Sequence, residues 1–229
     1  MTFDFNLIIE SIPLLFEGIG LTLQLLFLSS ILGLALAIVV LLMRISGRWY
    51  LSVPAFLFVY VFRGTPILVQ IFVIYYGLPQ FEAVRDSIFW ALLREPFGCA
   101  TLALSLNAGA YVSEILRGGI LGVGRELHEA GSALGLSKAQ RFIYVTTPIA
   151  VRLAIPAYSN DFISMLKATA LASTVTLLDM TGVARTIVAK TFAPYEIFIA
   201  AAIIYLTMTW IIQRSFGLLE GRLSRYVKK

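Results

Sequence analysis

Long apolar segments constrain this sequence more than any other feature. Gly18 to Met43 contains no charged residue and is longer than the about 20 residues that a helix needs to cross a bilayer. Further apolar segments run from about Phe58 to Pro79, from about Pro96 to slightly beyond Ser113, and from about Ile197 to Ile212. With 59% hydrophobic and 14% charged residues, the chain is too apolar for a soluble domain. The sequence predicts an all-α polytopic membrane protein.

Two other segments are interrupted or short. Ile149 to about Leu166 is apolar but contains Arg152 and Asp161, and we count it as a fourth span between the third and the last. Thr169 to Leu178 is too short to cross, which predicts a re-entrant or surface helix, buried in protein if re-entrant. We therefore expect five spans in a single transmembrane domain that covers residues 1–229.

Basic residues are distributed unevenly around these five spans. Twelve of the eighteen fall on one side, namely Arg44, Arg48, Arg117, Arg125, Lys138, Arg141, Arg152, Arg214, Arg222, Arg225, Lys228 and Lys229. The positive-inside rule makes that side cytoplasmic and places the N-terminus outside. The net charge of +5 then follows from membrane topology, and no nucleic-acid partner is expected.

A polar segment separates the third and fourth spans. Arg125 to Leu134 has the period of a short amphipathic helix, with an apolar face that includes Leu127. Gly135 stands where a left-handed cap is needed, and Ser137 begins a capping-box pattern. Pro148 restricts how the second helix enters the next span. These residues predict a helix-glycine-helix elbow outside the bilayer, which suits the docking of a partner.

The elbow resembles a known motif, the EAA loop E-A-A-x3-G-x9-I-x-L-P in membrane subunits of ATP-binding-cassette (ABC) importers. The residues that carry the resemblance are Glu129, Ala130, Gly131, Gly135 and Pro148. Gly131 stands where the motif has its second Ala, Val145 where it has Ile and Thr147 where it has Leu. The resemblance implies that residues 125–148 form a cytoplasmic coupling helix that rests on an ATPase subunit.

Three further motifs extend the resemblance over nearly the whole chain. They are Arg63-Gly64-Thr65-Pro66, LNAGAYVSEILRGGI at residues 106–120 and LKATALAS at residues 166–173. In this order they are similar to the polar-amino-acid branch of ABC importers. Within it they look most like the M-type permease, which pairs with a Q-type permease to import histidine, other cationic amino acids or opines.

This resemblance implies a type I ABC importer permease fold and a set of partners. The partners are a second, Q-type permease, two cytoplasmic ATPase subunits that hold ATP and Mg, and a periplasmic binding protein that delivers the substrate. The expected location is the bacterial inner membrane. The chain itself is expected to bind no cofactor and no metal.

Ionisable groups inside the spans are costly, so they are candidates for the substrate pathway. Glu114, Asp161 and Lys167 are such groups. Tyr111 shares a helical face with Glu114, and Asn160 adjoins Asp161 in a polar run. The alternative is that these groups pair with one another and hold the helices together.

Arg63-Gly64-Thr65-Pro66 is also a Gly/Pro break, which the sequence places at a membrane edge. Backbone groups that Pro66 leaves unpaired need other partners there. The Arg63 side chain is expected to reach the cytoplasmic headgroups or, alternatively, to contact a loop or another subunit.

Enzymatic chemistry is not expected of this chain. It has a single histidine, His128, a single cysteine, Cys99, and no G-x4-G-K-[ST] phosphate loop. Hydrolysis of ATP would therefore take place on another polypeptide. Two alternatives to a permease remain at this stage: a proton-coupled secondary transporter that uses Glu114 and Asp161, and a membrane assembly subunit that passes no substrate.

Overall fold

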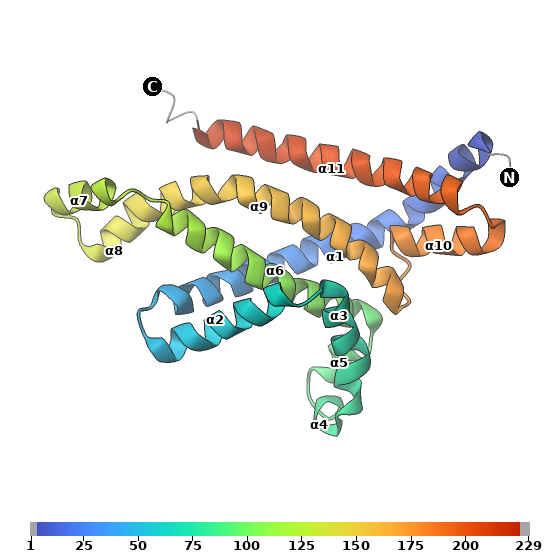
Figure 1. Ribbon diagram of the computed structural model, residues 1–229, viewed down its shortest axis with the longest axis horizontal. Helices are drawn as coiled ribbons and strands as arrows, with labels where there is room; N and C mark the ends of the chain where they lie inside the picture. Colours follow the sequence, from blue (N-terminus) through green and yellow to red (C-terminus); the bar gives the residue numbers. More distant parts are fainter. Residues whose placement is uncertain (1–3, 225–229) are drawn as a thin grey trace.

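The computed structural model describes residues 4–224, and these residues form helices and short connections without a strand (Figure 1). The basic residues Arg225, Lys228 and Lys229, which contribute to the orientation argument, lie outside this range. The elements in chain order are α1 (Phe5–Ile45), α2 (Trp49–Gly64), α3 (Ile67–Phe72), the π-helix η1 (Val73–Gly77), η2 (Leu78–Gln80), α4 (Glu82–Arg85), α5 (Trp90–Leu93), α6 (Pro96–Leu121), α7 (Arg125–Ala133), α8 (Lys138–Arg141), the π-helix η3 (Phe142–Thr146), α9 (Thr147–Thr169), the 3-10 helix η4 (Ala170–Val175), α10 (Met180–Thr191) and α11 (Pro194–Ser224).

The first helix begins well before the segment that hydropathy identifies. The Asp4 side chain accepts hydrogen bonds from the backbone N–H groups of Asn6, at 2.9 Å, and Leu7, at 3.4 Å. This cap satisfies two of the free donors at the start of α1, so the helix extends through residues 5–17 as well. The predicted boundary at Gly18 therefore marks where charges stop, not where the helix starts.

Four long helices, α1, α6, α9 and α11, lie side by side and form the body of the molecule (Figure 1). Small residues allow their backbones to approach closely. A Cβ atom on Gly33 of α1 would lie 2.5 Å from the Ala108 Cβ of α6, and one on Gly119 would lie 2.5 Å from the Ala150 carbonyl oxygen of α9. Close approach of this kind is how helices gain packing energy where apolar lipid supplies no hydrophobic drive.

The predicted span from Phe58 to Pro79 is wrong as a single helix. The chain breaks at Thr65 and Pro66, and the two helical parts are bent by 106° relative to each other. In Figure 1 this break lies near the middle of the bundle, and α3, α4 and α5 then leave it at a steep angle. The Arg63-Gly64-Thr65-Pro66 motif thus interrupts a helix that packs beside α6, and its four residues are exposed.

Gln70 satisfies the backbone groups that the break leaves unpaired. Its side-chain amide donates to the carbonyl oxygens of Phe62, at 2.8 Å, and Thr65, at 3.0 Å. Asn107 of α6 donates to the same Phe62 oxygen, at 3.3 Å, and to the Gln70 side-chain oxygen, at 3.1 Å. The break is therefore fixed by a small polar network within apolar surroundings.

The segment Thr169 to Leu178 is partly buried, with Thr176 and Leu178 exposed. Ala172 and Val175 are completely buried, and Thr176 turns the chain in a left-handed conformation with φ 67°. The helix that follows, α10, was not predicted from the sequence. Its start packs against α1 so closely that a Cβ on Gly18 would lie 2.6 Å from the Met180 backbone.

Three helices, α1, α6 and α11, are long and apolar enough to cross a membrane by themselves. Two bent pairs, one around the Thr65–Pro66 break and one around Thr176, pass the same test together, which allows up to five spans. Five spans and an external N-terminus stay predictions. The elbow lies at one end of the bundle, and α10 lies at the opposite end with the start of α1 (Figure 1).

Candidate functional site

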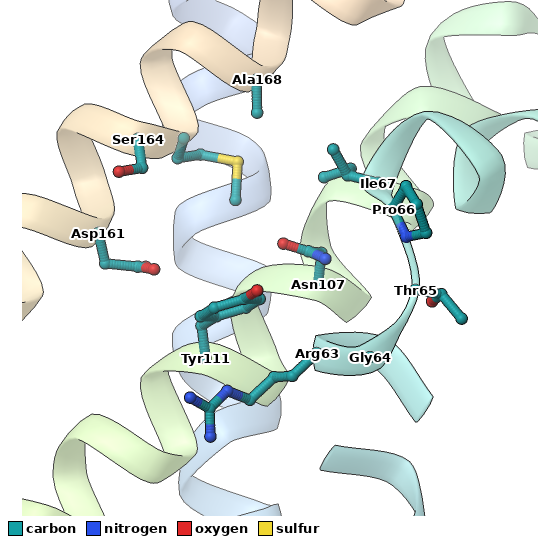
Figure 2. A pocket seen from close by; sticks show the side chains of 11 residues that line it. Arg63, Gly64, Thr65, Pro66, Ile67, Asn107, Tyr111, Asp161, Ser164 and Ala168 are labelled. Atoms are coloured by element: carbon teal, nitrogen blue, oxygen red, sulfur yellow. The ribbon is translucent and has the colours of Figure 1, made fainter. Parts of the chain in front are cut away.

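A polar cavity lies where the α2–α3 break faces α6 and α9. Its volume is about 590 Å³ (Figure 2). All four residues of the Arg63-Gly64-Thr65-Pro66 motif line it, and the polar side chains across from them are Asn107, Tyr111, Asp161 and Ser164. Polar side chains that converge on a cavity are the groups that orient a bound small molecule.

Arg63 and Asp161 are the two charged residues at the wall of this cavity, which we call the first cavity. The Arg63 guanidinium lies over the Tyr111 ring, 5.2 Å from its centroid. Figure 2 shows the Asp161 side chain projecting from α9 toward Tyr111, while the Arg63 side chain runs beneath that ring. Neither charge forms a salt bridge within residues 4–224. The two opposite charges are therefore both available to a ligand.

Glu114 lies outside the first cavity and is held by two arginines. Its two carboxylate oxygens accept from the Arg117 Nη2, at 2.7 Å, and from the Arg117 Nε, at 3.0 Å to each oxygen. One of them also accepts from Arg44 of α1, at 3.3 Å. The Glu114 side chain is 15% exposed, so these contacts compensate a mostly buried charge. This arrangement is the ion pairing that the sequence left open as the alternative to a pathway role.

Asn160 and Lys167 lie on the outer face of α9. Both residues are exposed, and neither lines the first cavity, although Ala168 beside Lys167 does. Of the five residues proposed for the substrate pathway, the structure thus brings Tyr111 and Asp161 together. Their roles stay predictions. Within residues 4–224 no group of three His, Cys, Asp or Glu side chains is placed to hold a metal ion.

The elbow has the local geometry that its sequence predicts. Gly135 adopts φ +75°, between α7 and α8. The Ser137 hydroxyl accepts from the Gln140 N–H at 3.3 Å, and the Gln140 side chain accepts from the Ser137 N–H at 2.9 Å, which completes the capping box. Pro148 lies in the first turn of α9, directly after the π-helix η3.

Gly131 is buried inside the elbow, at the position where the family motif has an alanine. A Cβ there would lie 3.2 Å from the Arg141 Cγ, so the glycine leaves room for the Arg141 side chain. That side chain donates to the His128 carbonyl oxygen at 3.3 Å and also contacts the Ser132 hydroxyl. The two arms of the elbow are therefore tied together across the turn.

The outer side of the elbow is apolar and uncovered. Leu134 is 80% exposed and Leu127 39% exposed, and Ala130 between them is exposed as well. Glu129 forms only an exposed pair with Arg125, at 3.5 Å, which contributes little stability in water. Exposed apolar side chains on a polar segment are typical of a surface that another protein covers.

Sequence reasoning missed Gln70, Asn107, Arg44 and Arg117. Gln70 and Asn107 are polar side chains within otherwise apolar segments, which is a signal that could have identified them. Arg44 and Arg117 were used only to orient the chain, because their contact with Glu114 depends on how α1 packs against α6.

A helical membrane protein with a broken helix beside a polar cavity, and with an exposed elbow between its spans, has the form of a transport permease. The profile of one family, the "binding-protein-dependent transport system inner membrane component", matches residues 29–225. The chain belongs to this family and is a membrane permease of the ABC transporter type.

Two similar proteins are permeases of named transport systems. The "octopine transport system permease protein OccM" of Rhizobium meliloti is 45% identical over 97% of this chain and 91% of its own length. The "histidine/lysine/arginine/ornithine transport system permease protein HisM" of Escherichia coli (strain K12) is 40% identical over 93% of this chain and 90% of its own.

Solved structures agree on the fold. One is the crystal structure of an amino acid ABC transporter with histidines. A chain of that structure superposes on this one with a TM-score of 0.87 at 35% identity, and the match covers 97% of this chain and 100% of that chain. A chain of the MetNI methionine ABC transporter has a TM-score of 0.75 at 16% identity, over 94% of this chain and 99% of that one, and supports the fold alone. The type I importer permease fold expected from the sequence is confirmed.

Proposed function

We propose that this permease forms the path by which an ATP-driven importer carries compounds that combine a carboxylate with a cationic group, namely cationic amino acids or opines. The names of the relatives support this class of compound. So does the first cavity, whose two charged residues have opposite signs.

The observation that carries this proposal is the pair of uncompensated charges, Arg63 and Asp161, at the wall of one cavity. An unpaired charge in a partly desolvated site is costly, and a ligand of complementary charge offsets that cost. The Arg63 guanidinium suits a carboxylate, which it binds through two parallel hydrogen bonds. Asp161 suits an ammonium or guanidinium group, and Tyr111 lies beside the Arg63 guanidinium.

The surfaces of the chain fit the partners of such an importer. The exposed polar side chains Asn160, Ser164 and Lys167 on one face of α9 would be expensive against lipid, so we assign this face to a second, Q-type permease or to the path between the two. The apolar outer side of the elbow is assigned to one of two ATPase subunits, which hold ATP and Mg. A periplasmic binding protein delivers the substrate, and the complex belongs to a bacterial inner membrane.

The elbow and the cavity are connected by helix. Residues 138–169 run from α8 through η3 into α9 without a non-helical residue, and Asp161 lies in this run. Closure of the ATPases on ATP would move the elbow as a lever, and α9 would transmit the motion to the cavity wall. Such a two-state element lets a remote ligand change which side of the membrane the cavity opens to.

Uptake by the complex reconstituted in proteoliposomes with its native partners tests this proposal. We expect Asp161→Asn and Arg63→Gln to lower arginine uptake at least tenfold while the complex assembles normally, because each removes a charge-assisted contact of the ligand. Asp86→Asn, an exposed change of the same kind on the α4 side, is the matched control and should stay within twofold.

Two results would contradict the proposal. Uptake that is unchanged in both cavity variants would make Arg63 and Asp161 structural residues. Uptake that continues without ATP but stops on adding a proton uncoupler would instead favour the proton-coupled alternative. Glu114→Gln should also impair uptake, through the loss of its two arginine contacts, and should reduce the amount of assembled complex as well.

A further inference from the structure

A second cavity, of about 350 Å³, adjoins the first and carries an excess of positive charge. Arg63 and Gly64 line both cavities, so the two meet at the α2–α3 break. The charged groups that face the second cavity are Arg44, Arg63, Glu114 and Arg117, from α1, α2 and α6. Three guanidinium groups thus face one carboxylate, which leaves two positive charges uncompensated.

These charges are held in place. Arg117 and Arg44 both bind Glu114, and their side chains are 34% and 15% exposed. The Arg44 guanidinium also lies over the Phe56 ring, 5.0 Å from its centroid. A guanidinium has five N–H donors. Arg117 uses its Nε and Nη2 groups on Glu114 and Arg44 uses its Nη2 group, so both arginines retain free donors. The wall therefore presents preorganised donors that suit an oxyanion.

The second cavity lies on the elbow side of the first. Arg44 is in the last turn of α1, and Arg117 is close to the end of α6, which leads into the elbow. Tyr111 and Asn107, which line the first cavity, stand earlier on α6. A compound that moves from the first cavity toward the elbow end would thus meet Arg44 and Arg117 next.

We propose that the Arg44, Arg63 and Arg117 guanidiniums form a second oxyanion site, which binds a carboxylate of the transported compound. This inference rests on the proposed function and deepens it. A simple cationic amino acid has a single carboxylate, which Arg63 accepts where the two cavities meet, while Asp161 accepts its cationic side chain. A compound with a second carboxylate also fills the second site, so the permease favours opine-type dicarboxylates over simple cationic amino acids of the same side chain.

Octopine and arginine are a matched pair of probes, because octopine is arginine with a second carboxylate attached through its α-nitrogen. Both are added to the purified complex of this chain with its native permease and ATPase partners in lipid nanodiscs. Calorimetry without the binding protein then reports the permease site itself. We expect octopine to bind about tenfold more tightly than arginine, the effect of one charge-assisted contact.

Substitutions assign this difference to the second cavity. Arg117→Gln should weaken octopine binding about tenfold and change arginine binding less than twofold. Arg117→Lys keeps the charge but loses the planar guanidinium, so its octopine affinity should lie between those of Arg117→Gln and the unchanged complex. Arg214→Gln, a change on α11 away from both cavities, is the control and should alter neither. Melting temperatures equal to that of the unchanged complex show that the variants remain folded.

Each other outcome has a definite meaning. If arginine binds through Arg63 and Asp161 but Arg117→Gln weakens both ligands equally or neither, the proposed function stands and the second site is wrong. If neither ligand binds the unchanged complex, both proposals fail. Octopine preference that appears in phosphatidylcholine nanodiscs but disappears when phosphatidylglycerol is added would assign the guanidiniums to a lipid headgroup and overturn the site.

Discussion

Gly135 offers a sharp test of how the elbow communicates with its partner. Its φ of +75° is a conformation that L-residues with a Cβ rarely adopt, and a Cβ built there meets nothing within 4 Å. A substitution is therefore strained through the backbone alone, without a steric clash. We expect Gly135→Val to cost roughly 1–3 kcal/mol in the native elbow, a strain that is relieved if α7 turns relative to α8.

Two matched variants isolate this effect. A Cβ on Gly217 of α11 also meets nothing within 4 Å, but Gly217 has no positive φ, so Gly217→Val adds the same side chain without the strain. Gly135→Asn keeps a residue that tolerates the left-handed conformation and should lose well under half of the activity. Uptake and ATP hydrolysis in proteoliposomes, normalised to the amount of inserted protein, provide the readout.

The expected result is a large loss of uptake in Gly135→Val, with insertion close to normal, and no loss in Gly217→Val. A misplaced elbow should also reduce the hydrolysis of ATP that the loaded binding protein stimulates. If Gly135→Val transports as well as Gly217→Val at equal protein levels, the elbow does not act as a rigid coupling element.

Two further predictions concern topology and packing. In a background without Cys99, a cysteine that replaces Arg85 should react with an impermeant thiol reagent in intact cells. A cysteine that replaces Ser137 should react only after the cells are permeabilised. Labelling at position 137 in intact cells would contradict the predicted orientation. Gly18→Ala places a Cβ 2.6 Å from the backbone of α10 and should destabilise the protein by about 1–3 kcal/mol in thermal melts. Gly20→Ala is the control, because a Cβ there meets nothing within 4 Å, and it should not destabilise the protein. Equal melting temperatures of the two variants would contradict the close α1–α10 packing.

The sequence by itself determined the class of protein and the local form of the elbow. Apolar segments that are long enough to cross the bilayer predict spanning helices, because unpaired backbone groups are too costly in lipid. Gly135 and the Ser137–Gln140 capping box are equally direct, since each acts within a few residues of chain. Where the signal was local, the structure agrees with it.

Tertiary structure decided what local signals could not. Hydropathy gave residues 58–79 as one span, although they contain a 106° bend, because apolar content does not record the direction of a chain. The start of α1, by contrast, depends on a local signal, the Asp4 cap, which lies outside the apolar window. The 3-10 helix η4 packs against α3, α6 and α9, while α10 packs against α1 and α11, and hydropathy does not record these contacts.

The candidate site divides in the same way. Charge inside an apolar segment was enough to single out Glu114 and Asp161. Only the fold shows that Asp161 shares a cavity with Arg63, while Glu114 binds Arg44, seventy positions away in the chain, and the nearby Arg117. A sequence lists which charges must be compensated in the membrane. Which group compensates each charge depends on helix packing, because electrostatic pairing acts over a few ångströms of space and not along the chain.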